Sequence, residues 1–69
     1  MDRQSLLAAF RIAIDKEEEA ARFYRELAEK ADDPEMKKLF QRFVIDESSH
    51  RESLKDLYRA LRETVPPGE

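Results

Sequence analysis

Apolar residues recur along this chain at alternating spacings of four and three residues, the spacing of one face of a helix. They fall on Leu6, Phe10, Ala13, Ala20, Tyr24, Leu27 and Ala31 in the first half, and on Met36, Phe40, Phe43, Leu54, Leu57 and Leu61 in the second. Neighbouring apolar residues widen each stripe: Leu7, Ile14, Ala21, Ala28, Leu39, Val44 and Tyr58. Stripes of this width are more typical of a helical bundle than of a narrow two-stranded coiled coil. The pattern therefore predicts two long helices, each with one broad apolar face.

The segment Asp32-Asp33-Pro34 separates the two stripes and has the composition of a helix start. Asp33 suits the N-cap, Pro34 fits the first helical position, and Glu35 complements the helix dipole. We expect a helix over residues 2–31, a second helix over 34–64, and a flexible tail over 65–69 that contains Pro66-Pro67-Gly68. Helices of about 30 residues joined by so short a connection form an antiparallel hairpin. The predicted fold class is all-α, with two antiparallel hairpins pairing into a four-helix bundle that covers the stripes.

Three ionisable residues interrupt the stripes: Glu17, Glu47 and His50. Glu47 and His50 are one helical turn apart, so their side chains point the same way. Glu17 lies about four helical turns before the predicted connection, and the other two lie about four turns after it. All three should therefore meet in one layer near the middle of the hairpin. Because a carboxylate or imidazole that faces a core is costly unless something binds it, we expect a metal ion there.

A dimer of such hairpins would supply four carboxylates and two imidazoles, which is the ligand set of a di-iron bundle. Two divalent ions would balance the four negative charges. Oxygen-rich ligation with one imidazole per metal suits iron or manganese, whereas zinc usually takes fewer ligands. The expected cofactor is two iron ions per dimer, with manganese or zinc as substitutes. The competing interpretation is a non-catalytic helical oligomerisation module in which a polar layer sets the register of the helices.

The composition narrows the other classes of function. The chain has 69 residues, no cysteine, a single glycine, 42% charged residues and a net charge of −3. The lack of cysteine excludes disulfides, zinc–thiolate sites and thiol catalysis, so a chain this short depends on metal or on self-association for stability. The charge gives little support to nucleic-acid or anionic-membrane binding. With no signal peptide and no apolar stretch near the ~20 residues of a membrane span, the expected location is the cytoplasm.

Two stretches resemble the ferritin-like superfamily, most closely its rubrerythrin-type members: Glu17 to Ala28, and Phe40 to Leu54 with the motif Asp46-Glu47-Ser48-Ser49-His50. The spacing Glu-x-x-Ala-x-x-x-Tyr of that family matches Glu17, Ala20 and Tyr24. The resemblance implies that Glu17 is a terminal carboxylate ligand, Glu47 a bridging carboxylate and His50 the histidine ligand, and that these three carry the catalysis. Glu18 and Glu19 are rival candidates, but each turns 100° or more away from the helix seam.

The chain departs from full family members because it carries one hairpin instead of two. It resembles encapsulated ferritins in this respect, in which the site forms between subunits, so the resemblance implies an obligatory homodimer and adds an encapsulin-type shell as a partner and compartment. The lack of cysteine removes the Cys₄ iron centre of rubrerythrins that carry a rubredoxin module. That favours a ferroxidase, which oxidises Fe²⁺ with O₂ or peroxide for iron storage or detoxification. The closest rival is a peroxide reductase that is fed by an external electron donor.

Several nearby residues have two interpretations. Asp46 is either a solvated aspartate or an acceptor for the ring N–H of a His50 on a neighbouring helix. Tyr24 could support the metal ligands, but it and Tyr58 are expected mainly as packing aromatics. Arg51 borders the same layer and is expected to be solvated rather than paired with a ligand carboxylate. Three apolar residues, Ile12, Phe23 and Ile45, point away from the stripes and hint at assembly beyond a dimer.

Overall fold

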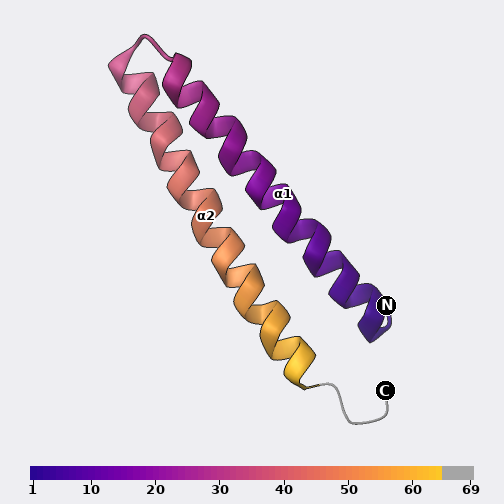
Figure 1. Cartoon of the computed structure of the whole chain (residues 1–69). Coiled ribbons are helices and arrows are strands. Elements are labelled where there is room, and N and C mark those ends of the chain that lie inside the picture. The colour runs from indigo at the N-terminus through magenta and orange to yellow at the C-terminus, as the bar shows by residue number, and fades with distance from the viewer. Residues whose placement is uncertain (65–69) are drawn as a thin grey trace.

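Two antiparallel helices form a hairpin in a computed structural model that describes residues 1–64 (Figure 1). Helix α1 spans Arg3–Lys30 and helix α2 spans Pro34–Glu63, so the predicted hairpin is confirmed and each helix end lies within one residue of its predicted place. The molecule is a rod with extents of 55 × 15 × 14 Å. Neither helix is long and apolar enough to cross a membrane. The flexible tail predicted for residues 65–69 lies outside the described residues.

Short side chains and one proline define where the helices begin. The carboxylate of Asp2 accepts a hydrogen bond from the backbone N–H of Ser5 at 2.7 Å, which caps α1. The carboxylate of Asp33 does the same for the N–H of Glu35 at 2.9 Å, and Pro34 occupies the first position of α2. Pro34 loses nothing there, because the N–H groups of a first helical turn have no partner within the helix. These caps keep the connection to three residues and place the two helices side by side.

Two alanines are the most deeply buried residues between the helices. Ala21 is 1% exposed and Ala28 is also buried, and they are the only buried residues in the part of the chain that the structure describes. Their small side chains let the two backbones come close together. Both alanines lie beside the predicted apolar stripe rather than at its centre, so the seam between the helices runs along one edge of the stripe. The rest of the stripe is left to one side of the seam.

One side of the seam is held by polar contacts between the helices, and we call it the paired flank. Lys55 Nζ lies 3.7 Å from Glu18 Oε1, and Lys37 Nζ donates to the carbonyl oxygen of Ala28 at 2.7 Å. Nearer the open end of the hairpin, Arg11 Nη1 donates to the hydroxyl oxygen of Tyr58 at 3.3 Å. These side chains reach over the apolar contact below them and find their partners within the same chain.

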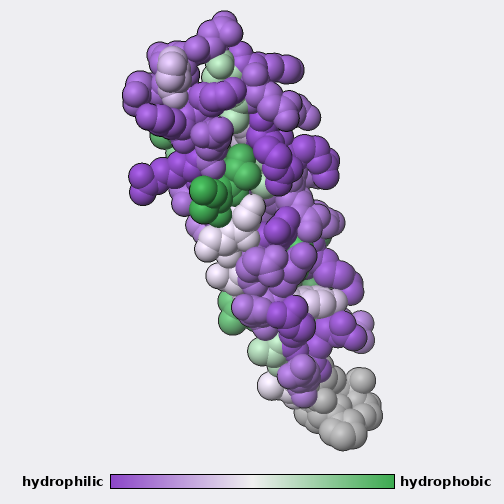
Figure 2. All heavy atoms as spheres, turned by 60° about the vertical axis from the view of Figure 1, so that its left-hand side comes forward, coloured by the Kyte–Doolittle hydropathy of each residue, from purple (hydrophilic) through white to green (hydrophobic). Residues whose placement is uncertain are grey.

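The opposite side, which we call the open flank, carries the rest of the apolar stripe. Leu6, Leu39 and Leu57 lie along it, and Leu57 is 56% exposed. The rings of Tyr24 and Phe43 pack edge to face across the helices with centroids 5.1 Å apart, and Phe40 extends this aromatic layer toward the connection. Most of the surface seen in Figure 2 is hydrophilic, so the apolar atoms stand out as separate green patches. A single hairpin therefore leaves much of its stripe in contact with water.

Candidate metal centre

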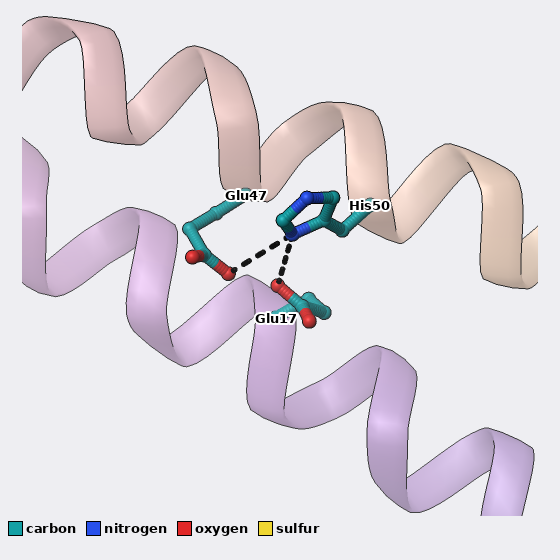
Figure 3. Close-up of side chains that lie close together, drawn as sticks. All are labelled: Glu17, Glu47 and His50. Carbon is teal, nitrogen blue, oxygen red and sulfur yellow. Dashed lines mark ion pairs between the residues drawn. The ribbon is translucent and has the colours of Figure 1, made fainter.

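Glu17 from α1 and Glu47 and His50 from α2 point toward one another near the middle of the hairpin (Figure 3). His50 Nδ1 lies 3.7 Å from Glu17 Oε2 and 3.9 Å from Glu47 Oε2. One ligand atom from each residue lies within 4.8 Å of the other two. The three residues therefore do share one layer, as their distances from the connection predict, and that layer opens onto the open flank.

Burial differs within this trio. The side chains of Glu17 and Glu47 are 24% and 23% exposed, whereas that of His50 is 59% exposed. Glu17 Oε2 itself is fully shielded from solvent and has no hydrogen-bond partner. A shielded carboxylate oxygen without a donor or a cation is unfavourable. Glu17 Oε2 thus receives a hydrogen bond neither from the protein nor from solvent.

The carboxyl of Glu47 is affected by the same crowding. The pKa of Glu47 is raised by the hydrogen bond that its protonated carboxyl could donate to Glu17, by partial burial and by the charge of Glu17. The charge of His50 opposes this rise, and the charge of Asp46 adds to it. The nearby charge of Glu17 disfavours ionisation of Glu47. A proton on Glu47 would also give Glu17 a hydrogen-bond donor. Glu47 therefore holds a proton more readily than a solvated glutamate does, and a bound cation would replace that proton.

The rival glutamates are engaged elsewhere. Glu18 turns to the paired flank, where it faces Lys55, and Glu19 lies 3.8 Å from Lys16 on the outer surface of α1. Neither belongs to the trio. Within residues 1–64 no further histidine or acidic side chain joins the three, so the structure brings together the predicted set without adding a ligand.

Among residues 1–64, no hydrogen bond or ion pair links the neighbouring Asp46, Tyr24 or Arg51 to the trio. Asp46 is exposed, and no hydrogen bond joins it to His50 among the described residues. The ring of Tyr24 packs against Phe23 and Phe43 rather than against a ligand. Arg51 lies 3.4 Å from Glu52, and its Nε is buried without a partner. In the hairpin Tyr24 thus packs among aromatic rings, and Arg51 pairs with a residue outside the trio.

The donor set fits a divalent transition metal. Two carboxylate oxygens and one imidazole nitrogen converge on one small volume, and oxygen with nitrogen ligation suits iron and manganese. A cation between the two carboxylates would give Glu17 Oε2 a partner, and it would favour the ionised form of Glu47, whose pKa is otherwise raised. Three donors alone would leave coordination positions of such an ion unfilled. Further ligands must then come from water, from a substrate or from a second chain.

Comparison with known protein families matches residues 2–65 to the rubrerythrin family. The chain belongs to the rubrerythrin family. No curated protein and no solved structure matches it. Membership confirms the rubrerythrin-type resemblance and supports a ferritin-like di-iron protein, for which Glu17, Glu47 and His50 form the candidate metal group. The likeness to encapsulated ferritins, with the protein shell it implies, stays a prediction.

Proposed function

We propose that this rubrerythrin-family hairpin binds Fe²⁺ between two copies of itself and oxidises it with O₂ or peroxide. The observation that carries the proposal is the shielded Glu17 Oε2, which lacks a hydrogen-bond partner and lies 3.7 Å from the imidazole of His50. Family membership supports di-iron chemistry, and the trio supplies oxygen and nitrogen donors for it. The ligands are Glu17, Glu47 and His50 of each copy.

A second copy is the proposed source of the missing ligands. The trio opens onto the same flank as the uncovered apolar residues, so a hairpin that covers Leu57 also brings its own trio to the site. Burying that flank removes apolar surface from water, which is the main force in association of this kind. Two copies together supply four carboxylates and two imidazoles for two iron ions. On this proposal the pairing of the hairpins and the completion of the site are one event.

The reaction is a transfer of electrons from iron to the oxidant. Each Fe²⁺ that becomes Fe³⁺ gives up one electron. Two such ions in one site give up two electrons, which with two protons reduce O₂ to hydrogen peroxide, or reduce hydrogen peroxide to two molecules of water. Holding both ions together lets the oxidant accept both electrons at one place.

The side chains have separate parts in this scheme. Glu17 and Glu47 offset the charge of the incoming ions, and the proton that the raised pKa of Glu47 favours is released as the ion enters. His50 turns Nδ1 toward both carboxylates, so this nitrogen is the ligand atom and must be unprotonated. The ring N–H at Nε2 then points to the outside of the site, where an acceptor would orient the ring.

The test adds Fe²⁺ to the metal-free protein and follows ferric absorbance, first in air and then anaerobically with hydrogen peroxide. A ferroxidase gives rapid ferric absorbance in air, and the rate is saturated at two iron ions for each pair of chains. A response to peroxide alone would assign the protein to the peroxide-reductase alternative. Iron that oxidises no faster than in buffer would contradict the proposal.

Thermal stability separates this proposal from the non-catalytic module. A ligand that binds only the folded state stabilises it, by about 2.7 kcal/mol when the free ligand is at one hundred times its dissociation constant. Redox-silent Mn²⁺ or anaerobic Fe²⁺ should therefore raise the melting temperature of the protein. The variant Glu18→Ala, which leaves the trio intact, serves as the matched control and should respond in the same way. An unchanged melting temperature in the parent protein would favour the module.

A further inference from the structure

A second row of side chains follows α1 on the side away from α2. Ile12, Lys16, Glu19 and Phe23 are spaced by four, three and four residues, so they lie on one face of the helix. At about 100° per residue, the centre of this row lies about 100° around α1 from the stripe that contains Glu17. We call these four residues the outer row. A hairpin that covers the open flank leaves the outer row free.

The outer row exposes two large apolar side chains. Ile12 is 60% exposed and Phe23 is 55% exposed. Between them lie two charged residues of opposite sign, since Lys16 Nζ is 3.8 Å from Glu19 Oε2 and both side chains are largely exposed. An exposed ion pair of this kind contributes little to the stability of one helix. The row therefore has the composition of a contact surface: apolar at both ends and charged in the middle.

The order of the outer row is complementary to itself when reversed. Ile12 and Lys16 are four residues apart, as are Glu19 and Phe23. If a second α1 packs antiparallel about a two-fold axis between Lys16 and Glu19, each apolar residue faces an apolar one and each charge faces the opposite charge. Ile12 of each copy meets Phe23 of the other, and Lys16 of each copy meets Glu19 of the other. We propose that the outer row is a second interface at which α1 packs antiparallel against α1 of another copy.

The pairing has a physical basis in both parts of the row. The four-three-four spacing is that of a narrow helix–helix seam, in which side chains of one helix fit between those of the other. Contact between Ile12 and Phe23 removes apolar surface from water at both ends of the seam. In the middle, two ion pairs within the chains become a ring of four alternating charges. Parallel packing would instead place Lys16 against Lys16 and Glu19 against Glu19, and repulsion disfavours that arrangement.

Charge reversal tests the pairing. In Lys16→Glu the two central positions are both acidic, and in Glu19→Lys both are basic, so each variant repels itself across the seam. Their mixture restores both contacts between chains, although neither variant has the Lys16–Glu19 pair within its own chain. We expect each variant alone to dissociate at this interface at least tenfold more readily than the parent chain, and the equimolar mixture to recover the parent mass in sedimentation velocity. Single variants of unchanged mass, or a mixture that does not recover it, would overturn the proposal.

Cysteine cross-linking tests the register independently, because the chain has no cysteine of its own. Mixing Ile12→Cys with Phe23→Cys should give a disulfide-linked pair of the two variants under mild oxidation. Either variant alone should give at least tenfold less, because identical positions lie about three helical turns apart in this register. The control mixture of Phe23→Cys with Ile45→Cys, on the exposed outer side of α2, should not cross-link. Equal yields in all mixtures would refute the register. Both tests use metal-free protein, so their outcome does not depend on the proposed iron chemistry.

Discussion

The two flanks of the helix seam differ in how well one chain meets its own bonding requirements. On the paired flank, Glu18 lies against Lys55 and Lys37 reaches the carbonyl of Ala28, so the charged groups find partners within the hairpin. On the open flank, Leu57 is largely exposed and Glu17 Oε2 has no hydrogen-bond partner. Glu18 and Lys37 thus have partners on the paired flank, whereas the open flank leaves apolar surface exposed and one carboxylate oxygen unpartnered. The candidate site lies on the open flank. The proposed second hairpin would therefore both cover the apolar stripe and supply further ligands to the site.

The largest expected effect is on metal binding. Glu47→Ala removes one carboxylate per chain from the trio and should weaken iron binding about 100-fold or more, since even the loss of a group that only supports a ligand costs 10- to 100-fold. Helix content in circular dichroism should remain, because among residues 1–64 Glu47 caps no helix and forms its ion pair within the trio. Elemental analysis measures bound iron. The matched variant on the paired flank is Glu18→Ala, which should keep its iron. Equal iron contents in Glu47→Ala and Glu18→Ala would contradict the assignment of the metal site to the open flank.

The next effect is on association. Leu57→Glu places a charge on the open flank and should lower the mass of the assembly, because the pairing of hairpins would bury that charge. Iron binding should be lost with it, although no ligand has been changed. Ile45→Glu is the control, since Ile45 is even more exposed but points away from both interfaces. Light scattering and iron analysis follow the two properties together. Iron binding at full capacity by the dissociated Leu57→Glu protein would show that one hairpin suffices.

The aromatic layer next to the trio should determine stability rather than binding. Phe43→Ala removes the ring that packs against Tyr24 and Phe40, and it should lower the free energy of unfolding by about 2 kcal/mol, less than for a fully buried ring. Urea denaturation of the metal-free protein measures the loss. Tyr24→Phe keeps the ring and removes only the hydroxyl, so it should cost far less and leave iron binding unchanged. Loss of iron binding in Tyr24→Phe would assign that hydroxyl a part in the site.

A smaller effect is expected from the ion pair of the paired flank. Glu18 and Lys55 are both more than one third exposed, so their interaction should contribute about 0.5 kcal/mol to stability. A double-mutant cycle with Glu18→Gln and Lys55→Met isolates the coupling between them. High salt should weaken it further. A coupling of several kcal/mol would mean that the paired flank carries much more of the stability than its exposure implies.

The smallest effect concerns the cap of α1, which belongs to neither flank. Hydrogen bonds from the backbone and side chain of Ser5 lower the pKa of Asp2 below its usual value of 3.8. The cap therefore stabilises the helix above pH 3.8, and this contribution is lost as the pH falls through the lower pKa of the folded state. The amide proton resonance of Ser5 should report this titration in NMR spectra. Asp2→Asn should abolish the titration, and a midpoint above 3.8 would contradict the assignment.

Much of the fold can be read from the sequence because local rules govern it. Asp33 and Pro34 specify where the second helix begins, and the four-three spacing specifies which side of each helix is apolar. Equal distances from the connection also place Glu17 level with Glu47 and His50, since the rise per residue of a helix is constant. The choice of Glu17 over Glu18 followed from the same periodicity. The trio was therefore predictable before any contact between the helices was known.

Only the tertiary structure decides how the two helices are turned about their axes. Periodicity shows which face of each helix is apolar. Which part of that face lies between the helices depends on where the side chains are small enough for close packing. Here these are Ala21 and Ala28, at the edge of the stripe. That rotation leaves Leu57 exposed on one flank and lets Glu18 reach Lys55 on the other. It also leaves Glu17 Oε2 without a hydrogen-bond partner among residues 1–64. The sequence by itself determined which residues form the candidate site, and packing determined that this site lies on the uncovered side.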